Sequence, residues 1–174
     1  PVPAVSMKAY LAGGCFWCIA PLIKLVEGVN SVTAGYCGGD EDHPVYEAVK
    51  HQETGHRETI CVDYVPSFIS YPDLVKIFLQ SVDPFDEGGQ FIDRGFSYTL
   101  AIYCETPEQE AQAKEQIRAL EDAEGRKSFV SVLPLKTFWP AEEYHQNYSE
   151  KNPEEFLEEW KASGREAYFG ALPE

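Results

Sequence analysis

The alternation of hydrophobic and polar positions along the chain predicts strands and helices in turn. Runs rich in β-branched and aromatic residues predict strands at 8–14, 29–36, 57–65, 97–105 and 128–135. Segments with helical spacing lie between them, at 16–26, 44–51, 70–81, 106–122 and from 152 onward. Strands that alternate with helices indicate an α/β or α+β fold, with helices packed on one sheet. The pattern leaves the order of the strands open.

Several predicted helices begin at residues that favour a helix start. Ser70 can cap one helix, and Thr106-Pro107-Glu108-Gln109 forms a capping box with proline at the first helical position. Asn152 before Pro153 predicts the start of a final helix. These boundaries come from local chemistry and do not depend on how the elements pack.

The chain reads as a single domain. No repeat, low-complexity tract or linker divides it, and its length of 174 residues suits one hydrophobic core. Met7 is the only methionine, so we expect the domain to span residues 7–174 and interpret residues 1–6 as a remnant of cloning.

Charge and hydropathy limit the partners that we expect. The formal net charge is −15, and no basic patch offsets it, so a nucleic-acid partner is excluded. No apolar run approaches the roughly 20 residues that cross a bilayer. The opening residues, PVPAVSM, lack the charged and apolar regions of a secretion signal. We therefore expect neither a nucleic acid nor a membrane as partner.

The number of cysteines indicates the cellular environment. Five cysteines without a secretion signal argue against a disulfide scaffold and favour a reducing, cytoplasmic location. Zinc would require about four ligands, usually in two close pairs. The chain has one close cysteine pair, and its histidines show no matching spacing; they stand at positions 43, 51, 56 and 145. We therefore expect no metal site.

The stretch GGCFWC, residues 13–18, places Cys15 at a glycine turn just before a predicted helix. Free N–H groups and the helix dipole stabilise a thiolate there, and the glycines expose the sulfur. Cys61 and Cys104 lie inside apolar strands, where buried and inert cysteines are the rule. Cys15 is therefore the candidate nucleophile.

The spacing of Cys15 and Cys18 also suits a thioredoxin-type dithiol. The bulky Phe16 and Trp17 between them are more typical of a pocket for a small apolar group than of a surface for extended chains. A general thiol–disulfide oxidoreductase therefore remains the alternative function.

Several motifs occur in a fixed order along the chain: GGCFWC, GYCGG, HPVYEAV, TGHRET, IDRGFSY and FWPAEEYHQNY. Together they resemble the methionine sulfoxide reductase A family from about residue 8 to about residue 152. The resemblance implies a two-layer ferredoxin-like sandwich. It also implies reduction of methionine-S-sulfoxide, free or in proteins, with no metal or organic cofactor and with thioredoxin or another thiol as reductant.

The resemblance also assigns roles to the residues that match the motifs. Cys15 is implied to be the nucleophile, which becomes a sulfenic acid, and Glu58 of TGHRET falls on the general acid. Tyr46 and Tyr98 fall on tyrosines that hydrogen-bond the sulfoxide oxygen. Asp93 matches an acidic residue that organises the site. Such donors are what a sulfoxide requires, because its sulfur is a poor electrophile until its oxygen is protonated or hydrogen-bonded.

Two further pairs of residues have implied roles in the same site. Phe16 and Trp17 are expected to form the apolar pocket for the S-methyl group of the substrate. His145 and Tyr148 of FWPAEEYHQNY are expected nearby, in support.

The step that recycles the oxidised enzyme stays open. Family members often carry a recycling cysteine where this chain has Lys50, or near the C-terminus, but no cysteine follows Cys104. Cys18 is the first candidate, because it lies within one helical turn of Cys15. Cys37 is the second, because we expect it in a glycine-rich loop that can move toward the site and accommodate a new bond. Direct reduction by an external thiol is the third.

Overall fold

A six-stranded sheet forms the centre of the computed structural model, which describes residues 5–170. The strands lie in the order β7-β6-β1-β3-β2-β8, and only β6 and β7 run parallel. Their bounds are β1 (Met7–Gly13), β2 (Val29–Cys37), β3 (Arg57–Tyr64), β6 (Leu100–Cys104), β7 (Ser131–Pro134) and β8 (Trp139–Pro140). The strands β4 (Gly89–Gln90) and β5 (Asp93–Arg94) form a separate small hairpin.

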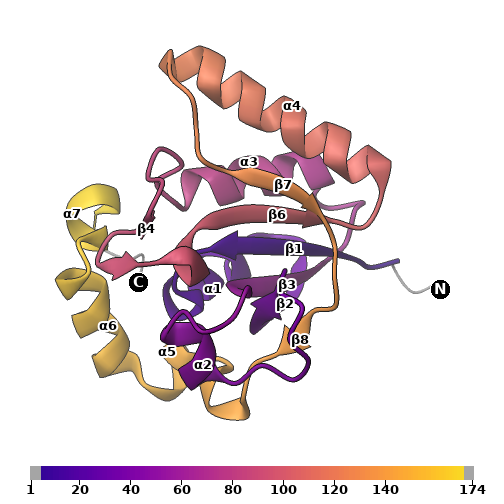
Figure 1. Ribbon diagram of the computed structural model, residues 1–174. Helices are drawn as coiled ribbons and strands as arrows, with labels where there is room; N and C mark the ends of the chain where they lie inside the picture. The colour runs from indigo at the N-terminus through magenta and orange to yellow at the C-terminus, as the bar shows by residue number, and fades with distance from the viewer. Residues whose placement is uncertain (1–4, 171–174) are drawn as a thin grey trace.

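The helices surround this sheet (Figure 1). They are α1 (Phe16–Lys24), α2 (Tyr46–Lys50), α3 (Tyr71–Gln80), α4 (Pro107–Glu124), α5 (Tyr148–Lys151), α6 (Pro153–Ala162) and α7 (Arg165–Phe169), with 3-10 turns at η1 (Phe96–Tyr98) and η2 (Glu143–His145). Among residues 5–170, no helix combines the length and the apolar character needed to span a membrane. Residues 1–4, most of the segment interpreted as a cloning remnant, lie outside the described part of the chain, as do residues 171–174.

The connectivity confirms the expected sandwich. The elements β1, α1, β2, β3, α3 and β6 follow one another as a β-α-β-β-α-β unit, and their strands pair in the order β6-β1-β3-β2. This is the ferredoxin-like arrangement. Helices α1 and α3 pack on one face of the sheet, and α4 lies beside α3 at the β6–β7 edge (Figure 1).

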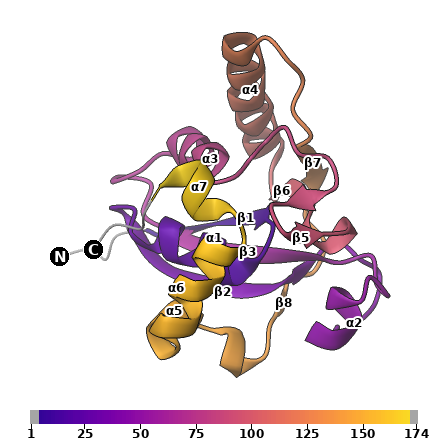
Figure 2. The ribbon, with the colours of Figure 1, turned by 90° about the vertical axis from the view of Figure 1, so that its left-hand side faces the viewer.

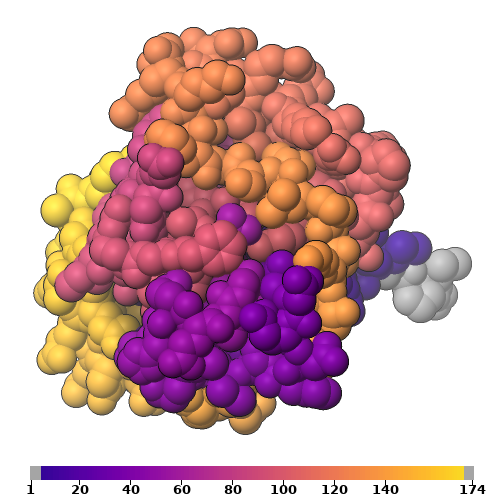
Figure 3. Space-filling view, in the orientation of Figure 1, coloured from indigo at the N-terminus to yellow at the C-terminus, as the bar shows by residue number. Residues whose placement is uncertain are grey.

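The two faces of the sheet are distinct because side chains alternate along each strand. Leu11, Ile60 and Ile102 point toward the helices and are fully buried in the main core. Tyr103 and Cys37 point to the opposite face and form a smaller cluster. The segment between α4 and β8 runs across that face, as its orange atoms in Figure 3 show.

The predicted helix starts are confirmed where the cap is local. The Oγ of Ser70 accepts from the Asp73 amide at 3.2 Å, and the Oγ1 of Thr106 accepts from the Gln109 amide at 3.1 Å. The Asn152 side chain makes no such cap, and α6 is followed by the short α7 rather than ending the fold.

The strand predicted at 97–105 begins only at residue 100. Residues 96–98 form a 3-10 turn, preceded by Gly95 with φ +122°. This turn directs the Tyr98 side chain toward the start of α1.

Candidate functional site

The start of α1 presents Cys15. Cys15 is the N-cap residue, half-buried, and its carbonyl accepts from the amides of Cys18 and Ile19. The two preceding glycines are required by geometry. Gly14 has φ +86°, and a Cβ on Gly13 would lie 2.9 Å from the Phe78 ring.

Glu58 lies directly behind this helix start. It is 1% exposed at the beginning of β3, and its Oε1 accepts from the Phe16 amide at 3.1 Å. Its Oε2 has no hydrogen-bond partner among residues 5–170. Burial raises the pKa of Glu58 to about 8, against the lowering effect of the Phe16 amide, and the nearby Asp93 charge adds to the rise. The carboxyl is therefore protonated at neutral pH and can donate a proton.

A pocket of about 250 Å³ opens beside Cys15. It brings together side chains that the motifs place far apart in sequence: Trp17, Cys18, Tyr46, Asp93 and Tyr98. Burial raises the pKa of both Tyr46 and Tyr98, so their hydroxyls keep their protons and act as donors. The remaining wall includes Lys50, Ile92, Glu159 and Arg165.

Contacts from η2 and α5, which follow the last strand, hold Trp17 in place. Its Nε1–H donates to Nδ1 of His145 at 2.9 Å, and its ring stacks on Tyr148 with centroids 4.0 Å apart. Burial lowers the pKa of His145, which keeps the imidazole neutral. Because Nδ1 accepts from Trp17, the proton of the imidazole lies on Nε2. His145 and Tyr148 therefore lie next to Trp17, close to the pocket, as we expected from the motif.

Phe16 occupies a different environment from Trp17. It is 1% exposed, its ring lies against those of Tyr36, Tyr46 and His145, and it is not among the residues that line the pocket beside Cys15. Its side chain supports Tyr46 from within the core.

The sequence analysis assigned no role to two residues that shape the site, Glu142 and Arg165. Glu142 accepts from the Tyr36 hydroxyl at 2.8 Å and from the Tyr46 amide at 3.1 Å, which positions α2. It lies within FWPAEEYHQNY, so that motif contained the signal. Arg165 donates from Nη1 to Asp93 at 3.2 Å, and no motif marks it.

The Cys15 and Cys18 thiols shift each other's pKa in opposite directions. A hydrogen bond from Cys15 to Cys18, together with burial, raises the pKa of Cys15, so the thiolate expected there from the helix start is wrong for the resting structure. The same hydrogen bond and the charge of Arg165 lower the pKa of Cys18, against the raising effect of burial. Cys18 is 3% exposed beneath Phe156 and Trp160 of α6. Figure 2 shows α6 and α7 passing in front of α1.

The other cysteines lie away from the pocket. Cys37 is in β2 rather than in a loop, and its Sγ lies 3.8 Å from the Lys136 carbonyl on the opposite face of the sheet. Cys104 is buried and Cys61 is half-buried, and all five cysteines are free thiols. Within residues 5–170 no group of three or more histidine, cysteine, aspartate or glutamate side chains is placed to hold a metal ion.

A ferredoxin-like sandwich with a cysteine at a helix start, beside a second thiol and a protonated carboxyl, defines a thiol-based oxidoreductase. Residues 7–170 match the model of the family described as peptide methionine sulfoxide reductase, and the chain belongs to this family.

Relatives span nearly the whole chain. It is 42% identical over 163 residues to "Peptide methionine sulfoxide reductase MsrA" of Halalkalibacterium halodurans, covering 92% of this chain and 93% of the relative. It is 44% identical over 148 residues to the protein of the same name from Picrophilus torridus, covering 84% and 83%.

Solved structures agree with these relatives. Methionine sulfoxide reductase A of Corynebacterium diphtheriae has a TM-score of 0.78 at 29% identity, covering 85% of this chain and 76% of that one. Reduced Mxr1 of Saccharomyces cerevisiae has a TM-score of 0.82 at 28% identity, covering 88% and 89%. A further structure contains Mxr1 in complex with Trx2; at 18% identity and a TM-score of 0.56, covering 83% and 86%, it shares the fold.

Proposed function

We propose that this protein reduces methionine-S-sulfoxide, free or within proteins, to methionine through Cys15. The observation that carries the proposal is the state of Glu58. Its carboxyl is buried, is protonated at neutral pH, has one oxygen without a partner, and is tied by a hydrogen bond to the helix that begins after Cys15. Together with the protonated hydroxyls of Tyr46 and Tyr98, this acid supplies a set of donors for a sulfoxide oxygen, which a general thiol–disulfide exchanger does not need.

In the proposed first step, the sulfoxide oxygen accepts hydrogen bonds from Tyr46 and Tyr98 and a proton from Glu58. Cys15 attacks the sulfur after losing its thiol proton. The oxygen passes to Cys15, which becomes a sulfenic acid, and the substrate sulfur gains two electrons and leaves as the thioether of methionine. One thiol and one sulfoxide thus give one sulfenic acid and one thioether.

Other residues of the pocket orient the substrate. The face of Trp17, fixed by His145 and Tyr148, suits the S-methyl group, while Phe16 supports the site from behind. Asp93 lines the pocket and organises its wall through Arg165.

Cys18 is the proposed resolving residue. It lies one turn along α1 from Cys15 and is hydrogen-bonded to it, whereas Cys37 faces the other side of the sheet. Condensation of the Cys18 thiol with the Cys15 sulfenic acid forms a disulfide and releases water. Thioredoxin, or another thiol reductant, then restores both thiols; the Mxr1–Trx2 complex supports a thioredoxin partner.

The alternative is a general thiol–disulfide oxidoreductase that uses the same Cys15–Cys18 pair without sulfoxide specificity. The spacing of the two cysteines favours it, and the pocket with its oxygen-directed donors argues against it.

The deciding experiment is a single turnover with the separate S and R epimers of N-acetylmethionine sulfoxide. We expect methionine to form from the S epimer and Cys15→Ser to abolish it, while the matched control Cys37→Ser behaves as wild type. Equal rates on the two epimers, or activity that survives Cys15→Ser, would refute the proposed function.

The proposal extends to the cellular compartment and to the bounds of the domain. We propose that the enzyme acts in the cytoplasm, which the free state of all five cysteines supports. We also propose one domain from residue 7 to residue 174, with residues 1–6 outside it, in keeping with the family match that begins at residue 7.

A further inference from the structure

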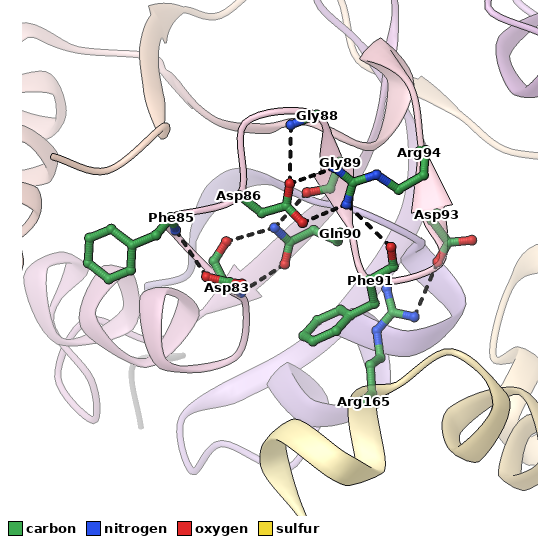
Figure 4. Close-up of polar contacts among 10 residues, drawn as sticks. All are labelled: Asp83, Phe85, Asp86, Gly88, Gly89, Gln90, Phe91, Asp93, Arg94 and Arg165. Carbon is green, nitrogen blue, oxygen red and sulfur yellow. Dashed lines mark hydrogen bonds and ion pairs between the residues drawn. The ribbon is translucent and has the colours of Figure 1, made fainter. Parts of the chain in front are cut away.

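A buried cation faces the pocket from the C-terminal part of the fold. Arg165, the first residue of α7, is 4% exposed, although arginine is rarely buried without a partner. Its Nη1 donates to Oδ2 of Asp93 at 3.2 Å, and its guanidinium lies 4.9 Å from the centre of the Phe91 ring. Figure 4 shows Arg165 reaching from α7 to Asp93, while the neighbouring Arg94 is engaged by Asp86.

The guanidinium of Arg165 also approaches the start of α1. Its Nη2 lies 3.7 Å from the position that a Cβ on Gly14 would occupy, next to Cys15 in the chain. Arg165 lines the same pocket as both cysteines. A guanidinium carries five N–H donors, and the contact with Asp93 uses one of them.

The charges around Cys18 explain what this cation does. Asp93 and Glu159 line the same pocket as Cys18, and their negative charges oppose ionisation of the Cys18 thiol. The buried Glu58 also interacts with it, and Cys15 supplies a hydrogen bond. The other cation of the pocket, Lys50, lies over the Tyr46 ring at the exposed rim. Arg165 is therefore the cation that offsets the negative groups around Cys18.

We propose that Arg165 is a positioning residue for the recycling half-reaction, in which it stabilises the thiolate of Cys18. This proposal rests on the proposed function and on Cys18 as the resolving residue. The Cys18 thiolate attacks the sulfur of the Cys15 sulfenic acid, an S–S bond forms, the S–O bond breaks, and the hydroxyl leaves as water after taking a proton. When a thiol reductant attacks Cys15, the more exposed sulfur, Cys18 leaves as the thiolate that Arg165 again stabilises.

The size of the effect follows from thiol chemistry. Loss of the Arg165 charge raises the pKa of Cys18 and so lowers its thiolate fraction at pH values below that pKa. The more basic thiolate is intrinsically more nucleophilic, so each tenfold loss of thiolate is offset about threefold. We therefore expect disulfide formation without the Arg165 charge to be a few-fold slower at neutral pH and to reach or exceed the wild-type rate at alkaline pH.

The test is a single turnover of the reduced, full-length protein with N-acetylmethionine-S-sulfoxide from pH 5.5 to 9.5. Acid quenching and mass spectrometry measure methionine formation and Cys15–Cys18 disulfide formation separately. The variants are R165Q and R165M, both neutral, and R165K, which keeps the charge. Lys161→Gln is the matched control, because it removes an exposed positive charge from α6, close to Arg165 in sequence.

R165Q and R165M are expected to shift the midpoint of the pH profile for disulfide formation upward, with recovery at alkaline pH, and R165K to return it toward wild type. Glu159→Gln is expected to shift the midpoint downward, because it removes an opposing charge. An unchanged midpoint in a folded neutral variant, or a slowing that is equal at every pH, would overturn the proposal. A wild-type protein that forms no methionine would instead refute the proposed function.

Discussion

The backbone amide of Phe16 donates to Oε1 of Glu58 at 3.1 Å, across a sequence separation of 42 residues. This bond ties the first residue of α1 to the start of β3. It places a carboxyl behind the nucleophile Cys15 and leaves Oε2 without a partner. Because the same helix start positions both groups, the proposed acid and the proposed nucleophile depend on this one long-range contact.

Glu58→Gln tests the acid. We expect methionine formation at pH 7 to fall about 100-fold or more, since a positioned acid contributes on that scale. The wild-type rate is expected to decline as pH rises through about 8, where Glu58 loses its proton. Single-turnover rates from pH 6 to 9.5 check both points, and the decline centred near pH 8 is expected to be absent in the variant. If the variant kept this decline in rate, a titrating group other than Glu58 would be its cause.

The same residue predicts a pH dependence of stability. The pKa of Glu58 is raised from 4.5 to about 8 by burial, so the unfolded chain releases this proton at lower pH than the folded protein does. Its contribution is fully present below pH 4.5 and is lost as pH rises to about 8, by up to about 1.4 kcal/mol per pH unit. Urea unfolding at several pH values is expected to show a correspondingly smaller loss in Glu58→Gln. Parallel curves for the two proteins would contradict the raised pKa.

Cys18→Ser separates reduction from recycling. We expect one equivalent of methionine per enzyme and a persistent Cys15 sulfenic acid, trapped with dimedone and seen by mass spectrometry. Cys37→Ser, on the opposite face of the sheet, is expected to form the disulfide as wild type does. Retention of an intramolecular disulfide in Cys18→Ser would transfer the resolving role to another cysteine.

Trp17→Phe tests the wall for the methyl group. The change removes the 2.9 Å hydrogen bond to His145 and reduces the stack on Tyr148. We expect kcat/KM to fall about tenfold, mainly through a higher KM, because the indole contributes to substrate binding more than to the chemical step. Trp139→Phe, in β8, serves as the control. A loss confined to kcat would contradict a binding role.

Gly35→Ala tests the attachment of the last sheet strand. A Cβ on Gly35 would lie 2.3 Å from the Phe138 ring and 2.5 Å from the Trp139 carbonyl, so β8 must move. We expect a loss of about 1–3 kcal/mol in the free energy of unfolding, measured in urea. Activity is expected to fall as well, because the segment after β8 carries Glu142 and His145. Gly55→Ala, where the nearest atom would be 3.4 Å away, is expected to be nearly neutral.

The sequence motifs did not predict which side chains face the pocket beside Cys15. Phe16 and Trp17 are adjacent in sequence, but consecutive helical residues point about 100° apart. The packing of α1 on the sheet buries Phe16 in the core and leaves Trp17 to line the pocket beside Cys15. Cys37 looked like a loop residue because glycines follow it, yet it ends β2, where alternation turns it away from Cys15.

The sequence by itself determined the positions of most strands and helices, the caps at Ser70 and Thr106, and Cys15 at a helix start. These features depend on residues within a few positions of one another, through hydrogen bonds and backbone preferences that act locally. Only the tertiary structure decided the burial of Glu58 and the contact between Asp93 and Arg165, 72 residues apart. A pKa and an ion pair depend on desolvation and distance in space, and both are set when α1, α6 and α7 pack around one pocket.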